Sequence, residues 1–260
     1  MIYTMTILDN VLDIANNFNI SSNDRYIAYK LFEYCDEIEK MTLTEFLDKI
    51  NISTSQFKKF YQNLNCNNYN ALKKNITLWC QIRLEQLTTR CNWQNIIKTS
   101  NILINLTNYK SVEEFLDIKI IDDICYQIKK CNRVILYGSE SMVSLTHDFQ
   151  IDMRLLGKLV VRSSLNEDKA IFPNTDDFIC FFSLTGRIVN VLGESTRINI
   201  TNSINKKLLI TQNNSIIIAD YILRLNMKNE YYETYYIVLF YLDVIKTRYY
   251  YLYYKKECDK

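Results

Sequence analysis

The chain has 260 residues, of which 48% are hydrophobic, so it can form one large domain or two ordinary ones around apolar cores. Its formal net charge is only +2, which excludes a protein that is basic over its whole surface and restricts any nucleic-acid contact to a local patch. Eight scattered cysteines form no C-x-x-C pair and there is one histidine, so we expect no metal site, no cofactor and reduced thiols in a cytoplasmic protein. The sequence shows no export signal and no apolar run long enough to span a bilayer, so we expect no membrane partner.

Helical periodicity dominates the first third of the chain. The apolar residues that recur at this spacing are Tyr26, Ile27, Leu31, Tyr34, Leu43, Phe46, Leu47, Ile50, Phe57, Phe60, Tyr61 and Leu64. They predict a small helical domain over residues 1–83.

Two helix-start signals of the same kind follow each other eleven positions apart. In the first, Thr42 can cap a helix through its hydroxyl while the Glu45 side chain reaches back to the backbone N–H of the cap. Ser53 and Gln56 repeat the signal, and the first helix has room for about two turns before the second begins. This spacing is typical of a helix-turn-helix, a motif that usually reads DNA.

The second of these helices would keep a polar face once its apolar residues are buried. Short hydroxyls and amides near a helix N-terminus can reach base edges, and lysines can hold phosphates. The candidate residues for contacts to double-stranded DNA are Thr54, Ser55, Gln56, Lys58, Lys59 and Gln62, with Lys73 on the next helix. The alternative is a three-helix scaffold in which the capping boxes only stabilise the helices.

Further along the chain the pattern changes to short β-branched runs, small-residue turns and helical segments. We predict connecting helices over residues 84–120 and an α/β domain over residues 121–260, hence an α + α/β fold. The predicted strands are 133–137, 158–162, 177–182, 197–201, 207–211 and 221–225, and the predicted helices cover 143–156, begin at 188, and cover 231–250. Buried parallel strands that alternate with helices predict a three-layer α/β/α sandwich, with ligands at the carboxyl ends of the strands.

Tyrosine is concentrated near the carboxyl end of the sequence. Ten of the twenty tyrosines lie at or after position 231. They fit either a helix that packs aromatic rings onto the sheet and then frays, or a contact between subunits, where tyrosine is enriched.

Five segments resemble one protein family in their order and spacing. They are Ser53–Leu64, Tyr69–Lys73, Gly138–Gly157, Ser183–Gly186 and Leu209–Thr211, the last followed by Ser215 and Ala219-Asp220. They are similar to parts of the RpiR family of bacterial transcriptional regulators. The first two resemble the recognition helix and the segment after it, and the others resemble loops, strands and an aspartate of the sugar isomerase (SIS) domain.

The resemblance implies a transcriptional regulator rather than an enzyme, with no catalytic residue. Its partners would be double-stranded DNA and a second copy of the chain, as a homodimer or a dimer of dimers, because paired recognition helices specify a palindromic site. Its effector would be a phosphorylated sugar or amino sugar. By the same resemblance, the ligand-binding candidates are Ser139, Ser141, Ser183 and Thr185.

Several positions depart from the family pattern. In the DNA helix the usual arginine is Lys59, and Asn65 and Asn68 replace glycines, although asparagine tolerates the left-handed conformation that such a turn needs. In the SIS domain Glu140 replaces a glycine, and its carboxylate would oppose a bound phosphate. Met142 replaces a serine and Ile188 replaces a threonine.

These departures leave two alternatives to an effector-binding regulator. In one, the small polar residues only close tight turns in a domain that is used for dimerisation. In the other, the SIS fold is a phosphosugar isomerase, which needs a base, and Glu140 is the acidic residue in a suitable loop. His147, which is next to Asp148 in a predicted helix, is expected to have a structural role.

Overall fold

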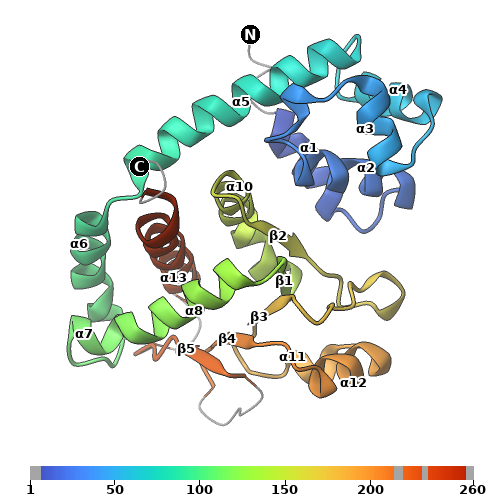
Figure 1. The fold of residues 1–260 in the computed structure, drawn as a ribbon. Coiled ribbons are helices and arrows are strands. Elements are labelled where there is room, and N and C mark those ends of the chain that lie inside the picture. Colours follow the sequence, from blue (N-terminus) through green and yellow to red (C-terminus); the bar gives the residue numbers. More distant parts are fainter. Residues whose placement is uncertain (1–6, 214–218, 230–233, 256–260) are drawn as a thin grey trace. The chain divides into compact units, whose positions relative to one another are not determined.

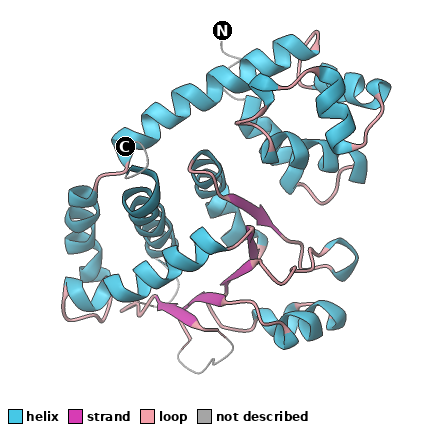
Figure 2. Ribbon diagram, in the orientation of Figure 1, coloured by secondary structure: helices cyan, strands magenta, loops and turns pink. Residues whose placement is uncertain are grey.

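The computed structural model describes residues 7–213, 219–229 and 234–255 (Figure 1). It divides into two compact units, Met1–Thr89 and Arg90–Lys260. Within the described residues, strands occur only in the second unit, and the fold class is the predicted combination of a helical part and an α/β part with a parallel sheet (Figure 2). No described helix is long and apolar enough to cross a membrane.

The first unit is helical throughout its described part. Its elements are α1 (Ile7–Asn16), α2 (Ser22–Glu33), the 3-10 turn η2 (Ile38–Lys40), α3 (Leu43–Ile50), α4 (Thr54–Asn63) and α5 (Tyr69–Arg90). An aromatic cluster joins α3, α4 and α5: the ring of Phe57 lies 5.3 Å from that of Phe46 and 6.1 Å from that of Tyr69. Both phenylalanines are fully buried, so these rings help to fix how the three helices pack.

The second unit contains a five-stranded parallel sheet flanked by helices. The helical elements are α6 (Trp93–Leu103), η3 (Ile104–Leu106), α7 (Val112–Phe115), α8 (Ile118–Lys130), α9 (Glu140–Val143), η4 (Ser144–Thr146), α10 (His147–Leu155), η5 (Glu167–Lys169), α11 (Ile188–Val191), α12 (Glu194–Asn202), α13 (Thr234–Tyr249) and a π-helical turn (Tyr250–Tyr254). The strands are β1 (Arg133–Gly138), β2 (Leu159–Arg162), β3 (Phe178–Phe182), β4 (Lys207–Thr211) and β5 (Tyr221–Arg224), in the order β2-β1-β3-β4-β5.

The sheet forms the middle of three layers. Helices α8, α10 and α13 lie on one face, and α11 and α12 lie on the other (Figure 1). All five residues of β3 are buried, which is the continuous apolar pattern of a strand covered on both faces. One charged pair lies inside the helical layer, where Lys246 of α13 donates to the fully buried Asp152 of α10 over 3.1 Å. The many tyrosines of the last turns pack partly on one another, as in the stacked rings of Tyr250 and Tyr254.

Two sequence predictions about this unit need correction. The predicted strand 197–201 is wrong, because these residues belong to helix α12. The alternation of polar and apolar residues suggests a strand. In the structure Thr196 and Ile200, one helical turn apart, are buried, while Ile198 is exposed. The predicted helix 143–156 begins earlier, at Glu140, and is interrupted by the 3-10 turn η4. The first residues of the predicted helix 231–250 lie outside the described part of the chain.

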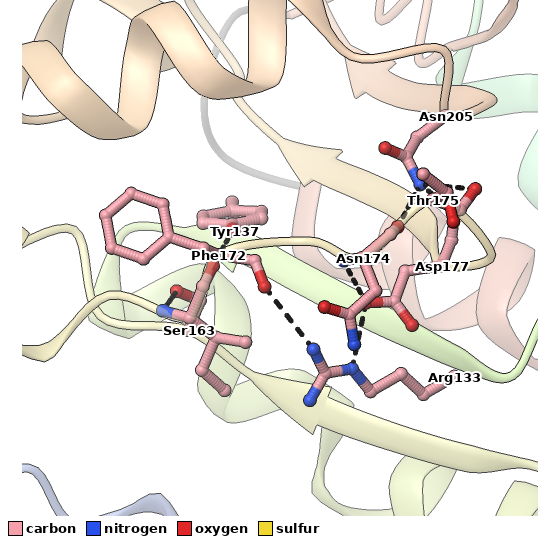
Figure 3. A network of polar contacts seen from close by, with 9 residues as sticks. Arg133, Tyr137, Ser163, Phe172, Asn174, Thr175, Asp177 and Asn205 are labelled. Atoms are coloured by element: carbon pink, nitrogen blue, oxygen red, sulfur yellow. Dashed lines mark hydrogen bonds and ion pairs between the residues drawn. The ribbon is translucent and has the colours of Figure 1, made fainter.

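The connection from β2 to β3 contains only the short turn η5 and is held in place by polar contacts (Figure 3). Arg133 Nε donates to Asp177 Oδ2 over 3.0 Å, and the Tyr137 hydroxyl donates to the carbonyl of Ile171. Burial raises the pKa of Tyr137 to about 12, so this donor keeps its proton over the physiological range. Asn205 is the other anchor, since its amide nitrogen donates to the carbonyls of Asn174, Thr175 and Asp177.

Replacing Asn205 with alanine is expected to destabilise the second unit by about 1–3 kcal/mol, because buried carbonyls would lose their donor. Urea unfolding followed by circular dichroism measures this difference. Asn199→Ala, at an exposed position of α12, is the control and should change the free energy of unfolding little. Equal stability of the two variants would contradict the anchoring role.

Candidate DNA interface and ligand site

A short turn connects α3 to α4, and side chains fix it at both ends. Asn51 ends α3 in the left-handed conformation with φ of 53°. Ser53 then caps α4, since its hydroxyl accepts from the Gln56 N–H over 3.3 Å while Gln56 Oε1 accepts from the Ser53 backbone over 3.3 Å. The turn is therefore fixed on both sides by the side chains that the sequence predicts.

The capping box at the start of α3 is also present. Glu45 accepts from the backbone N–H of Thr42 over 2.7 Å and from its hydroxyl over 2.8 Å. These donors lower the pKa of the Glu45 carboxyl, so the stabilisation that it provides is present above the unfolded pKa and is lost as the pH falls through the folded value.

Helix α4 buries one face and exposes the other. Phe57, Phe60 and Tyr61 are buried, and Leu64 at the end is half-buried. Six of the predicted DNA-contacting residues are exposed: Thr54, Ser55, Gln56, Lys58, Lys59 and Gln62. Ser55, Lys59 and Gln62 are spaced by four and three positions, so they form one row along the outer side of the helix.

Two of the predicted DNA-contacting residues already have structural roles. Gln56 Oε1 is occupied by the capping box. Lys73 is half-buried, and its Nζ donates to the carbonyl of Met41 over 3.2 Å, as does the Tyr69 hydroxyl over 3.1 Å. The structure therefore brings the remaining candidates together on α4 and holds Lys73 against the unit itself.

The two asparagines that stand at family glycine positions differ in conformation. Asn65 has φ of 58°, so the left-handed turn expected there is present. Asn68 is not left-handed, and its side chain instead accepts from the Ala71 N–H over 2.9 Å, which caps α5.

The order of the strands predicts where the second unit would bind a small ligand. From β1 the chain moves outward to β2 on one side and, through β3, outward to β5 on the other, so the order reverses between β1 and β3. Ligands in open parallel sheets bind outside the carboxyl ends of the strands at this reversal. Gly138 pairs with Phe182, and the next residues are Ser139 and Ser183. The structure thus places two of the predicted ligand residues at the expected edge.

The loop after β1 presents hydroxyls and one carboxylate. Ser139 and Ser141 are exposed, with their Oγ atoms 3.1 Å apart, and Glu140 between them is exposed too. A Cβ at Gly138 would lie 3.0 Å from Val143 Cγ1 and 3.1 Å from Phe182 Cβ, so the glycine lets β1 pack closely against these neighbours. An anion held by the two hydroxyls would therefore lie in the field of Glu140.

The loop after β3 is tightly closed. The buried Ser183 hydroxyl accepts from the Ile188 N–H over 3.1 Å, and Gly186 has φ of 69°. Thr185 is exposed, and its carbonyl accepts from the Asn213 amide over 2.9 Å. Ser183 thus closes the turn with one lone pair, while Thr185 remains accessible. Ser215, part of the resemblance, lies outside the described residues.

Comparisons with solved structures find distant likenesses. A hypothetical protein from Methanococcus jannaschii, for which a 3-hexulose-6-phosphate isomerase function has been inferred, is 17% identical with a TM-score of 0.44, covering 63% of this chain and 89% of its own. The Vibrio vulnificus NanR protein complexed with ManNAc-6P is 10% identical with a TM-score of 0.41, covering 97% and 94%. The sugar isomerase domain of an RpiR transcription factor from Sphaerobacter thermophilus is 14% identical with a TM-score of 0.39, covering 64% and 92%.

No model of a known protein family and no curated protein matches the sequence. The identities and TM-scores of the three structures are low, so the function has to be argued from this chain's own residues.

Substituting Ser53 with alanine removes the cap of α4 and is expected to destabilise the first unit by about 1 kcal/mol. Ser55→Ala is the control, because it removes a neighbouring hydroxyl but leaves the bond from Gln56 N–H to Ser53 intact. Urea unfolding followed by the fluorescence of Trp79, in a Trp93→Phe background, reports on the first unit. Loss of stability in the Ser55 variant alone would contradict the assignment of the cap.

Proposed function

We propose that the chain is a DNA-binding transcriptional regulator whose α/β unit responds to a phosphorylated sugar, as the resemblance to the RpiR family implies. The observation that supports it most is the exposed row on α4, where Ser55, Lys59 and Gln62 project from a helix whose other face is buried. Hydroxyl and amide groups read base edges and lysines hold phosphates, so this face has the composition of a recognition helix.

The local charge favours the same proposal. The whole chain carries a net charge of only +2, yet α4 exposes Lys58 and Lys59 and contains no acidic residue. A positive patch on one helix provides phosphate contacts without making the whole protein basic. Two such helices in a homodimer would contact two half-sites of a palindrome, so DNA binding is proposed to require a dimer.

The effector is proposed to bind at the strand ends, where Ser139 and Ser141 follow β1 and Ser183 and Thr185 follow the neighbouring strand β3. Hydroxyls and backbone N–H groups at such an edge can hold a phosphate. Glu140 weakens this cradle, since two like charges about 4 Å apart cost about 1 kcal/mol in water and more in a protected site.

A second candidate has one observation in its favour. Because the Ser183 hydroxyl already accepts from the Ile188 N–H, the loop after β3 is complete without a ligand. The α/β unit would then serve only to join two copies of a regulator that binds DNA constitutively. Catalysis as a phosphosugar isomerase ranks last, since Glu140, the candidate base, is an exposed carboxylate.

Replacing Lys58 and Lys59 together with alanine is expected to weaken DNA binding and to make the dependence of log K on log salt concentration shallower by about 2, if each lysine neutralises one phosphate. Fluorescence anisotropy with a DNA fragment selected from a random pool, measured over a range of salt concentrations, provides both quantities.

The control for this experiment is Lys110→Ala with Lys119→Ala, which removes the same charge from exposed positions in the second unit. An equal loss of affinity in both variants would show that only net charge matters. If the wild-type protein binds no DNA at any salt concentration, the regulator proposal is wrong.

The ligand site is tested by thermal shift against inorganic phosphate and a panel of pentose, hexose and hexosamine phosphates. Stabilisation of the wild-type protein is expected, since a ligand that binds only the folded state raises the melting temperature. Glu140→Gly and Glu140→Gln should both bind the same phosphate about fivefold more tightly, the factor that corresponds to about 1 kcal/mol of removed repulsion. A flat response from all three proteins would favour the constitutive regulator.

A further inference from the structure

The second unit begins at Arg90, which belongs to a cluster of charges within that unit. This cluster, here called the junction cluster, consists of Arg90, Asp152, Asp243 and Lys246. Helix α5 ends at Arg90, and the boundary between the two units falls immediately before that residue. Arg90 Nη2 lies 3.8 Å from Asp152 Oδ1, and Lys246 Nζ lies 3.1 Å from Asp152 Oδ2 and 2.6 Å from Asp243 Oδ1.

The two cations of the junction cluster differ in burial. The side chain of Asp152 is 0% exposed and that of Lys246 is 10% exposed, so their bond belongs to the interior and is needed to compensate the buried carboxylate. The side chain of Arg90 is 44% exposed, and its longer contact lies in a better-solvated setting. Arg90 can therefore leave Asp152 while Lys246 keeps the carboxylate paired, which makes the Arg90 contact the one that can switch.

A continuous set of hydrogen bonds leads from the strand-end site towards Asp152. Ser139 and Ser141 share a hydrogen bond of 3.1 Å, and the Ser144 hydroxyl donates to the carbonyl of Ser141 over 3.0 Å. Arg162 Nη2 donates to the carbonyl of Ser144 over 3.3 Å, and Arg162 Nε donates to Gln150 Oε1 over 2.9 Å.

Gln150 lies two residues before Asp152 in α10, and its own amide nitrogen donates to the Val160 carbonyl of β2 over 3.1 Å. The helix that begins at the site is also segmented, because the 3-10 turn η4 separates α9 from α10. A 3-10 stretch within a helix often marks a hinge, so α10 can shift when the loop after β1 closes on a ligand.

We propose that Arg90 couples ligand occupancy at the strand-end site to the carboxyl end of α5. Binding at Ser139 and Ser141 shifts α10, the shift moves the Asp152 carboxylate, and the Arg90 contact tightens. Arg90 and Asp152 act as positioning residues in this scheme and touch neither ligand nor DNA. The inference rests on the proposed effector site, for which it supplies the means of regulation.

Coupling of this kind needs two arrangements that the ligand binds differently, and its usual size is a factor of about 5 to 150. Cys91 is buried, and Asn92 caps α6 by accepting from the backbone N–H groups of Gln94 and Asn95. The segment after Arg90 is therefore fixed, and a change at the Arg90 side chain acts on the last turn of α5.

The test is hydrogen–deuterium exchange of the full-length protein with and without the phosphate ester that gives the largest thermal shift. Saturating ligand is expected to slow amide exchange in residues 86–92 of the wild-type protein by about fivefold or more, the lower bound of usual coupling. In Arg90→Ala the factor should fall to about 1 while the ligand-induced shift in melting temperature is unchanged. Arg90→Lys, which keeps the charge, should retain more than half of the response.

Lys98→Ala is the control, because it removes the same charge from an exposed position of α6 and should behave as the wild-type protein does. Three results would overturn the inference and leave the effector site standing. The first is an exchange factor in Arg90→Ala equal to that of the wild-type protein, and the second is an exchange factor of about 1 in Arg90→Lys. The third is ligand binding that changes no exchange rate in residues 86–92 of the wild-type protein. If no phosphate ester stabilises the wild-type protein, the effector site fails and the inference fails with it, and the thermal-shift measurement separates this outcome from the others.

Discussion

The parallel register between β1 and β3 is the constraint on which the second unit depends. Because Gly138 is opposite Phe182, the two following loops leave the sheet at the same height, and hydroxyls that are 44 residues apart in sequence, those of Ser139 and Ser183, come to one edge. The strand order also reverses between β1 and β3, which is where open parallel sheets generally bind ligands. The position of the candidate site is thus a consequence of topology, while its chemistry depends on the side chains of the two loops.

The sequence predicts those features that depend on local chemistry. Both capping boxes are present, since a hydroxyl and an amide or carboxylate three positions apart need no other part of the chain. The five strands are also found where their apolar runs predict them, as in the fully buried β3. Residues 197–201 fail this test, because their alternating pattern does not reveal that the Glu167 carboxylate accepts from the Ser195 N–H and so caps a helix there.

The junction cluster could not be predicted in this way. Asp152 and Lys246 are 94 positions apart, and neither has a neighbour in sequence that marks it as part of a buried pair. The candidate ligand site lies between these cases, since strand order places its residues at one edge. Whether a hydroxyl is free for a ligand or closes its own turn, as Ser183 does with the Ile188 N–H, depends on backbone geometry that spacing does not reveal.

In the described part of the chain three asparagines, Asn51, Asn65 and Asn226, adopt positive φ where glycine is the usual choice. Glycine would enter that region with less steric strain, yet it would also give the denatured chain more conformations to lose on folding. The chain has only four glycines. Its asparagine turns therefore carry more steric strain in the native state, while the conformational entropy of the denatured ensemble is smaller. Asn51 lies in the turn between α3 and α4. The backbone before the exposed helix α4 therefore samples fewer alternative turns than it would with glycine at this position.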